Sequence, residues 1–253
     1  MKEKRLQYVE EYIHSVGTAS LDEICERFHV SKNTVRRDVD RILEKGTIQK
    51  VYGGVTSISH NLVPFENRDH TNHPEKVALG KCAAQLIEDH DLIFIDSGTT
   101  TRNIIDFLPP LQQLTILTNS LDVINAAVNL DNVTLMTIGN RYKRKTKSFV
   151  SIDDLHILDK YNISKAFMAA TGVSIASGLT NSDILEYEIK KRIAEKTQKM
   201  YLLADASKFG KSTMLTYAPL RECDAIITSK MLPEEYRVFC RDNNITLHIC
   251  DET

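Results

Sequence analysis

The sequence predicts two domains: a small winged helix-turn-helix (α+β) domain, and a larger α/β domain with a Rossmann-like, mainly parallel sheet. Three observations predict this. A chain of 253 residues exceeds the usual size of one domain. Residues 1–58 contain closely spaced amphipathic helical patterns, followed by an alternating segment and a double glycine. Within residues 76–253, short β-rich runs alternate with helical patterns, which is typical of parallel strands joined by helices.

The composition is that of a folded protein in a reducing compartment. Hydrophobic residues make up 42% of the chain and charged residues 26%, so both domains can bury a core. The five cysteines are odd in number and include no CxxC pair, which argues against a disulfide framework or a zinc site. The N-terminus is charged and amphipathic, and no apolar run reaches the ~20 residues that cross a bilayer. We expect a cytoplasmic protein with no membrane partner, cofactor or metal.

Three helices are predicted near the N-terminus. Residues 6–16 place Leu and Val or Ile side chains at helical spacing, and this first pattern stops near Gly17. Ser20 and Glu23 form a capping-box pattern, which marks the start of a short second helix. The third helix is expected to begin after Ser31 as its N-cap and to stop at Gly46.

The third helix has two different faces. Val35, Val39 and Ile42 recur at helical spacing and are expected to point inward, which leaves polar and basic side chains outside. A basic helix on its own is more often a solvated surface helix, but a preceding helix and tight turn favour the helix-turn-helix geometry that reads DNA. The residues predicted to contact operator DNA are Ser20, Ser31, Lys32, Asn33, Thr34, Arg36, Arg37 and Arg41, with Lys50 and Tyr52 from the segment that follows.

A wing is predicted after the third helix. Residues 47–52 alternate like a strand, and Gly53–Gly54 supplies a turn that would let a hairpin lie along the phosphate backbone. The stretches VSKNTVRRD and EKGTIQKVYGGV, with the spacing of the first two helices, resemble the DeoR family of transcription regulators. The resemblance implies a DNA-binding region at about residues 20 to 39, in a winged-helix domain that ends near residue 58. This chain carries Tyr52 where the family usually has His.

Residues 59–75 are predicted to be a linker, because they contain two prolines, few apolar residues and no periodicity. Three histidines in this segment lack a fourth ligand, so solvated side chains are favoured over a metal site. Beyond the linker, strands buried on both faces are expected at 92–95, 114–118, 133–138, 166–169, 201–204, 225–228 and 245–249. Helical patterns are predicted at about 75–89, 100–107, 121–129, 182–198 and 233–242.

Polar loops follow several of these strands, at the end where parallel α/β sheets bind their ligands. Residues 96–101 read DSGTTT and lead into a helix, so backbone amides and hydroxyls can converge on a phosphate. Lys208 follows a later strand and could neutralise that charge. Each loop alone is more often a turn and helix cap, but together they predict a pocket. The predicted effector-binding residues are Asp96, Ser97, Gly98, Thr99, Thr100, Thr101, Asn119, Ser120, Gly139, Gly172, Asp205 and Lys208.

The stretches IFIDSGTTT, LTNSLDVINAA and LLADASKFGKS resemble the effector-sensing domain of DeoR regulators. The resemblance implies a fold similar to ribose-phosphate isomerase and the CoA transferases, and a phosphorylated sugar as effector. VPFENR, RYKRKTKSFV and DKYNISKAFMAATG resemble, more narrowly, the repressors of myo-inositol catabolism, whose inducer is a phosphorylated keto-deoxy sugar acid. We therefore expect a repressor rather than an enzyme. Because one reader helix covers a short site, we expect a homo-oligomer, a dimer or tetramer, on paired half-sites.

Two other functions fit part of the pattern. A purely architectural DNA-binding protein would have no function for the large domain and its predicted pocket. A sugar-phosphate isomerase with an appended DNA-binding domain is the stronger alternative, although the related isomerases carry Asp-Gly-Ala-Asp-Glu where residues 169–173 read AATGV. The basic stretch Lys143–Lys147 is either a solvated loop or a second anion contact. The acid and base groups that an isomerase could use are Asp96, Asp183, Glu186, Asp205 and Lys208.

Overall fold

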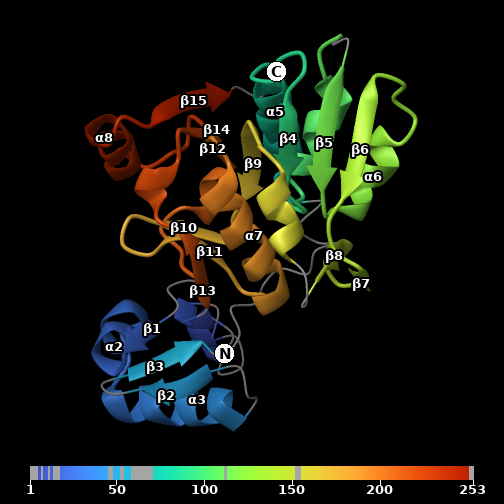
Figure 1. The fold of residues 1–253 in the computed structure, drawn as a ribbon. Coiled ribbons are helices and arrows are strands. Elements are labelled where there is room, and N and C mark those ends of the chain that lie inside the picture. The colour runs from blue at the N-terminus through green and yellow to red at the C-terminus, as the bar shows by residue number, and fades with distance from the viewer. Residues whose placement is uncertain are drawn as a thin grey trace. The chain divides into compact units, whose positions relative to one another are not determined.

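The computed structural model describes residues 5–6, 8–10, 12–13, 18–44, 48–51, 54–57, 71–110, 113–151 and 155–250. The chain divides into two compact units, Met1–Leu62 and Val63–Thr253, and Figure 1 labels the elements of both. The smaller unit has its own hydrophobic core, and the larger has two. None of the described helices combines the length and hydrophobicity of a membrane span.

The smaller unit combines helices with a three-stranded antiparallel sheet of order β1-β3-β2. The described residues between 5 and 13 are helical, and they precede β1 (Thr18–Ser20), α2 (Leu21–Phe28) and α3 (Lys32–Glu44). β2 (Ile48–Val51) and β3 (Gly54–Ser57) then form the hairpin predicted at the double glycine. The predicted helix stops at Gly17 and Gly46 lie outside the described residues.

Local caps and an apolar stripe explain why these helices form here. Ser20 Oγ accepts from the Glu23 backbone N at 3.1 Å, and the Glu23 carboxylate accepts from the Ser20 backbone N at 2.7 Å, so the predicted capping box is confirmed. Val35, Val39 and Ile42 of α3 are buried, as their spacing predicts. They pack with Ile24 of α2 and with the apolar residues of the first helical segment.

The larger unit is built on a seven-stranded sheet of order β15-β14-β12-β9-β4-β5-β6, in which every neighbouring pair is parallel. Its strands, in chain order, are β4 (Leu92–Ile95), β5 (Leu114–Thr118), β6 (Val133–Thr137), β9 (Lys165–Ala169), β12 (Lys199–Leu203), β14 (Ala225–Ser229) and β15 (Thr246–Cys250). All lie within two residues of their predicted positions. The predicted fold class is therefore confirmed.

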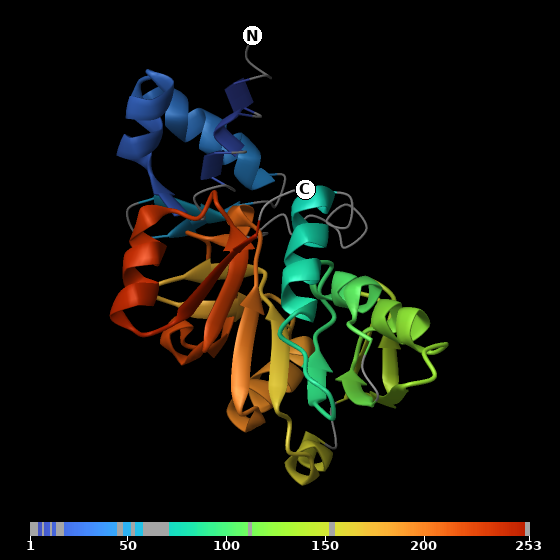
Figure 2. The same ribbon diagram turned by 90° about the horizontal axis from the view of Figure 1, so that it is seen from above.

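Helices cover both faces of this sheet, as Figures 1 and 2 show. Ile93 and Ile95 of β4 pack on one face, in the cluster that contains residues of α5 (His73–Ala84) and α6 (Leu121–Ala127). Phe94 packs on the other face, in the cluster that contains residues of α7 (Ile184–Lys196) and α8 (Glu234–Asp242). Packing on both faces explains why β4 is apolar along its whole length.

Several short elements surround the sheet and differ from the sequence prediction. The predicted helix at 100–107 is a 3-10 helix, η1 (Thr101–Phe107), and α5 begins at His73, inside the segment 59–75. An antiparallel sheet of β10 (Gly172–Ser174), β11 (Gly178–Asn181) and β13 (Leu215–Ala218) was not predicted, nor was the hairpin of β7 (Arg141–Lys143) and β8 (Ser148–Val150). The other 3-10 helices in the described part of the chain are η2 (Leu155–Lys160), η3 (Ala206–Lys208) and η4 (Leu220–Glu222).

Candidate functional sites

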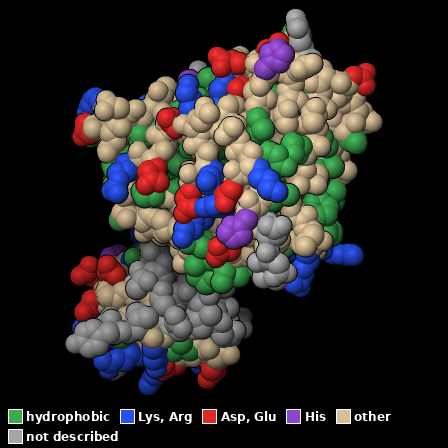
Figure 3. All heavy atoms as spheres, viewed as in Figure 1, with side chains coloured by type: hydrophobic (Ala, Val, Ile, Leu, Met, Phe, Trp, Pro, Cys, Tyr) green, Lys and Arg blue, Asp and Glu red, His purple; other side chains and the backbone are tan. Residues whose placement is uncertain are grey.

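The solvent face of α3 is basic. Lys32, Arg36, Arg37 and Arg41 are all exposed along this helix, as predicted. Figure 3 shows Lys and Arg side chains gathered along α3, with acidic side chains near both ends of the row. A helix presented in this way by a preceding helix and a tight turn has the geometry that meets base edges in the major groove.

Other residues of the predicted DNA-binding set hold the helices in shape. Ser20 caps α2, as described above, and Ser31 Oγ accepts from the Thr34 backbone N at 3.4 Å and lies 3.0 Å from the Thr34 hydroxyl. Asn33 is exposed at the start of α3, whereas Thr34 is half-buried. Tyr52 lies outside the described residues.

Two lysines of this set are ion-paired with neighbouring elements. Lys32 Nζ lies 2.6 Å from Asp22 Oδ1 of α2, and Lys50 Nζ of β2 lies 3.0 Å from Asp40 Oδ1 of α3. Both pairs line a groove of about 400 Å³ between the helices and the hairpin, and Arg36 lines the same groove. The predicted DNA-binding surface is therefore of mixed charge.

Asp38 anchors α3 from inside the unit. Its carboxylate is 2% exposed and accepts from Arg5 Nε at 2.8 Å and Arg5 Nη2 at 3.2 Å, a two-point pairing. The hydrogen bond to Asp38 raises the pKa of the Arg5 guanidinium above its ordinary value. The first helical segment is thus tied to α3.

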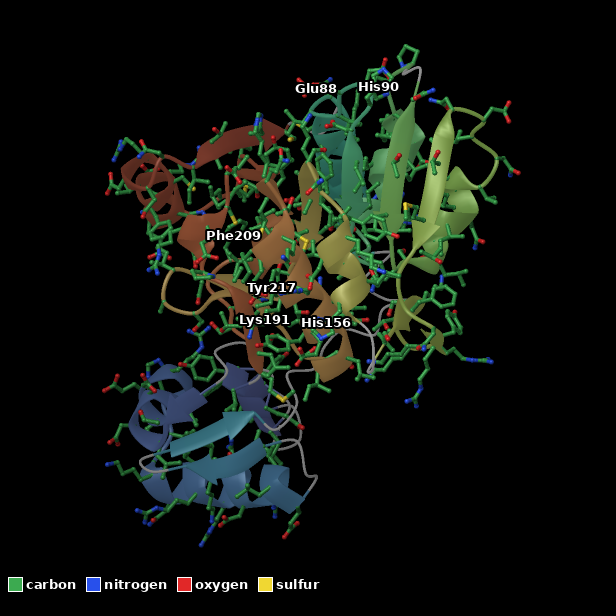
Figure 4. All side chains as sticks on the ribbon, in the orientation of Figure 1. Glu88, His90, His156, Lys191, Phe209 and Tyr217 are labelled. Atoms are coloured by element: carbon green, nitrogen blue, oxygen red, sulfur yellow. The ribbon has the colours of Figure 1, made fainter. Side chains whose placement is uncertain are left out.

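In the larger unit, the predicted effector residues follow strands at their carboxyl ends. We call this end of the seven-stranded sheet the carboxyl edge. Figure 4 shows it on the side of Phe209 and Tyr217, away from Glu88 and His90. Parallel strands bring their carboxyl ends to one edge, so the loops after β4, β5 and β12 all lie along it.

Asp96, directly after β4, is 1% exposed and fully engaged inside the protein. Oδ1 accepts from the Ser97 backbone N at 2.8 Å, while Oδ2 accepts from the Ala169 backbone N at 2.9 Å and pairs with the Lys190 ammonium. Lys190 Nζ also donates to the Ala169 carbonyl at 2.8 Å and lies 5.4 Å from the Tyr217 ring centroid. A buried ion pair needs such complete pairing to be tolerated, and this one joins β4, β9 and α7.

The loop after Asp96 is shaped by its own hydrogen bonds. Thr101 Oγ1 donates to the Asp96 carbonyl at 2.6 Å and to the Gly98 carbonyl at 3.1 Å. Asn103 Nδ2 donates to the carbonyls of the two residues after Gly98, at 3.0 and 3.1 Å. A Cβ at Gly98 would lie 2.4 Å from the Ala169 Cβ, so the loop leaves no room for a side chain there. The hydroxyl of Thr101 therefore supports the loop.

The loop after β5 is joined to the β7–β8 hairpin. Asn119 Nδ2 donates to the Phe149 carbonyl at 3.2 Å, and the Phe149 backbone N donates to the Asn119 carbonyl at 2.7 Å. Asn119 Oδ1 is buried and has no hydrogen-bond partner within the described part of the chain. Ser120 caps α6 by accepting from the Val123 backbone N at 3.3 Å. Gly139 has φ +91°, and a Cβ there would lie 2.7 Å from the Phe149 backbone.

Helix α7 directs charged side chains at this edge. Asp183, its N-cap, accepts from backbone N–H groups of the first turn at 3.1 Å and pairs with Lys143 of β7. Burial opposes the ionisation of Asp183, but the hydrogen bond from Lys143 and those from the backbone hold its pKa below the ordinary value. Glu186 Oε1 accepts from Ser148 Oγ of β8 at 2.8 Å. Together with Lys190, these residues tie α7 to the β7–β8 hairpin, to the loop after β4 and to β9.

The loop after β12 brings a cation to the same edge. Asp205 is 1% exposed and accepts from Asn72 Nδ2 at 3.3 Å, which connects it to the start of α5. Lys208 Nζ lies 3.9 Å from Asp205 Oδ2. A Cβ at Gly172 would lie 2.7 Å from the Lys211 carbonyl oxygen, so this glycine permits a close approach of two backbones. Several of the predicted effector residues thus hold the loops in shape.

Sequence reasoning missed Lys190, the Lys143–Asp183 pair and the Arg5–Asp38 pair. The helical spacing could have indicated Lys190, because it falls on the buried face of α7. The buried residues of this helix are Glu186, Ile189, Lys190 and Ile193. Charged residues at buried positions of an amphipathic helix are paired or functional. No grouping of His, Cys, Asp or Glu suited to a metal ion occurs among the described residues.

The fold and these two sites define a class of protein: a transcription regulator with a DNA-binding unit and a sensor unit. Residues 5–61 match the model of the DeoR-like helix-turn-helix domain, and residues 71–230 match the DeoR C terminal sensor domain. The chain belongs to the DeoR family, which confirms the resemblance seen in its motifs.

Relatives of known name agree with this family. The chain is 60% identical to the HTH-type transcriptional regulator IolR of Bacillus subtilis, over 98% of this chain and 100% of the relative. It is 26% identical to the L-fucose operon activator of Haemophilus influenzae over 95% of this chain and 97% of that protein. It is also 26% identical to the glycerol-3-phosphate regulon repressor of Escherichia coli, over 95% and 96% of the two chains.

Among solved structures, ribose 5-phosphate isomerase A from Methanocaldococcus jannaschii matches 55% of this chain and 55% of its own, with 19% identity and a TM-score of 0.40.

Proposed function

We propose that this regulator represses a carbohydrate catabolic operon, that of myo-inositol, and that a phosphorylated keto-deoxy sugar acid releases it from operator DNA. The observation that carries the proposal is the 60% identity with IolR over 98% of the chain. Two more distant relatives of nearly equal length are named for carbohydrate or sugar-phosphate regulons, one as an activator and one as a repressor. Repression is therefore proposed from VPFENR, RYKRKTKSFV and DKYNISKAFMAATG, the stretches that resemble the repressors of myo-inositol catabolism.

The effector is proposed to bind at the carboxyl edge, with its phosphate on the loop of residues 97–101 and Lys208 beside it. The preshaped loop supports this, because a loop that is ordered before binding loses less entropy on binding. The buried Asn119 Oδ1 supports it as well, since an unpaired buried acceptor is suited to a ligand hydroxyl.

We further propose that the protein is not an enzyme. Both oxygens of Asp96 are used by backbone N–H groups and Lys190. Glu186 accepts from Ser148 at 2.8 Å and from Asn181 at 3.4 Å, so it too is held by internal partners. A general base has to reach a substrate proton directly or through one water, and these carboxylates are committed elsewhere.

The experiment compares Lys208→Ala with Lys211→Ala, an exposed lysine of the same loop, as the matched control. Operator fragments are first selected from genomic DNA by the wild-type protein. We expect Lys208→Ala to bind the operator normally and to lose most of its response to phosphorylated inositol intermediates, because the charge-assisted contact lies in the sensor unit. Unchanged inducer affinity in Lys208→Ala would contradict the assigned phosphate site. Turnover of pentose or hexose phosphates would contradict the non-enzymatic assignment.

A further inference from the structure

Acidic side chains interrupt the basic surface of the smaller unit. Asp22 lies in the first turn of α2 and Asp40 in the second half of α3, and both are exposed. Each holds a lysine of a neighbouring element, at 2.6 Å for Lys32 and 3.0 Å for Lys50. The lysine side chains are 59% and 68% exposed, so a DNA phosphate could reach either ammonium.

The two pairs lie along one groove. Asp22, Lys32, Arg36, Asp40 and Lys50 all line it, so both carboxylates stand on the surface that carries the predicted DNA contacts. A phosphate that takes Lys32 or Lys50 has to displace a carboxylate already bound there. The displaced carboxylate then lies close to the phosphate and repels it.

We infer that Asp22 and Asp40 act as built-in competitors of DNA phosphates and so limit sequence-independent DNA binding. Such binding comes almost entirely from neutralising phosphates with Lys and Arg. A lysine that is already ion-paired with a carboxylate contributes less to this sequence-independent binding. The inference goes beyond repression and effector release, and it rests on the DNA-binding role of the winged unit.

Salt dependence gives this mechanism a distinct signature. A free lysine that binds a phosphate releases a condensed cation, which steepens the fall of affinity with salt by a slope of ~0.9 per contact. When the lysine first leaves a carboxylate, that carboxylate attracts a cation from solution and offsets the release. Removing the carboxylate should therefore restore a slope of about one unit per pair.

The test measures binding of the full-length protein to a random-sequence 30-base-pair duplex by fluorescence anisotropy across a KCl series. We expect Asp22→Asn and Asp40→Asn each to tighten binding about two- to fivefold at low salt and to steepen the salt slope by about one. Glu26→Gln is the matched control, because it removes one exposed acid from α2 outside the groove lining. It should leave the slope unchanged.

A double variant isolates the lysine concerned. Asp40→Asn combined with Lys50→Met should lose the gain of Asp40→Asn, since the freed ammonium is gone. Exposed ion pairs add little to stability, so thermal unfolding should be unchanged, and if Asp40→Asn fails to fold, Asp22→Asn carries the test. Unchanged affinity and slope in the Asp→Asn variants, or an equal gain in Glu26→Gln, would overturn the inference. If the wild type bound no duplex at all, the DNA-binding role itself would fail instead.

Discussion

Replacing Lys190 with methionine should destabilise the larger unit strongly. The substitution leaves the Asp96 carboxylate, 1% exposed, without its cation and with only two backbone donors. Breaking a buried ion pair from one side costs ~3–5 kcal/mol, and the remaining donors favour the lower end, about 3 kcal/mol. In a unit of this size, each kcal/mol lowers Tm by ~2–4 °C, so we expect Tm to fall by about 6–12 °C.

Thermal and urea unfolding of two further variants test whether the loss of stability comes from the broken ion pair. Lys191→Met changes an exposed lysine on the same helix (Figure 4), and its effect should stay within about 0.5 kcal/mol. Asp96→Asn combined with Lys190→Met should recover part of the lost stability, because no uncompensated charge remains buried. A loss below about 1 kcal/mol for Lys190→Met, or a double variant no better than the single one, would refute the assigned role of this pair.

Three further predictions concern DNA contacts, pH and thiols. Arg36→Ala and Arg37→Ala should each weaken operator binding by ~1–3 kcal/mol if the side chain contacts a base, or lower the salt slope by ~1 if it contacts a phosphate. Fluorescence anisotropy with mismatched operators distinguishes the two kinds of contact. Wild-type operator affinity in both variants would contradict the assignment of α3 as the DNA-reading helix. Because the pKa of Asp183 is lower in the folded than in the unfolded protein, its stabilising contribution is present above about pH 4 and is lost below it, so Asp183→Asn should make the acid loss of stability shallower in urea titrations from pH 3 to 6. Burial raises the pKa of the Cys223 thiol well above its usual range, so iodoacetamide should label half-buried Cys82 faster than Cys223, and equal labelling rates of these two thiols would contradict this.

The parallel strands could be predicted because burial on both faces leaves a local signature. Leu92–Ile95 is a continuous apolar run, and its residues alternate between the two cores. The short antiparallel strands have no such signature. Thr180 of β11 pairs with Gly172 on one side and Thr216 on the other, and a strand of four residues depends on these distant partners. Local periodicity cannot indicate such pairings.

The candidate effector site could be predicted as a set of loops, but not as a set of roles. A polar loop after a buried strand can be recognised in sequence, as for residues 96–101. Which side chains of such a loop remain available to bind a ligand depends on hydrogen-bond and ion-pair partners that come from distant parts of the chain. Asp96 is engaged by Lys190 of α7, which lies 94 positions further along the chain. The role of Asp38 likewise depends on a distant partner. In the sequence it is only an acidic residue on a basic helix, but in the fold its carboxylate pairs with Arg5.

We propose that effector and operator DNA oppose each other's binding to this protein, and operator affinity measured with and without a saturating phosphorylated keto-deoxy sugar acid tests this competition most directly. A hundredfold loss of affinity corresponds to ~2.7 kcal/mol of coupling, and linkage requires the operator to weaken effector binding by the same factor. We predict a loss of about this size, with no effect of the dephosphorylated compound at equal concentration. Unchanged operator affinity in the presence of the phosphorylated acid, or an equal effect of the dephosphorylated one, would contradict the proposed competition.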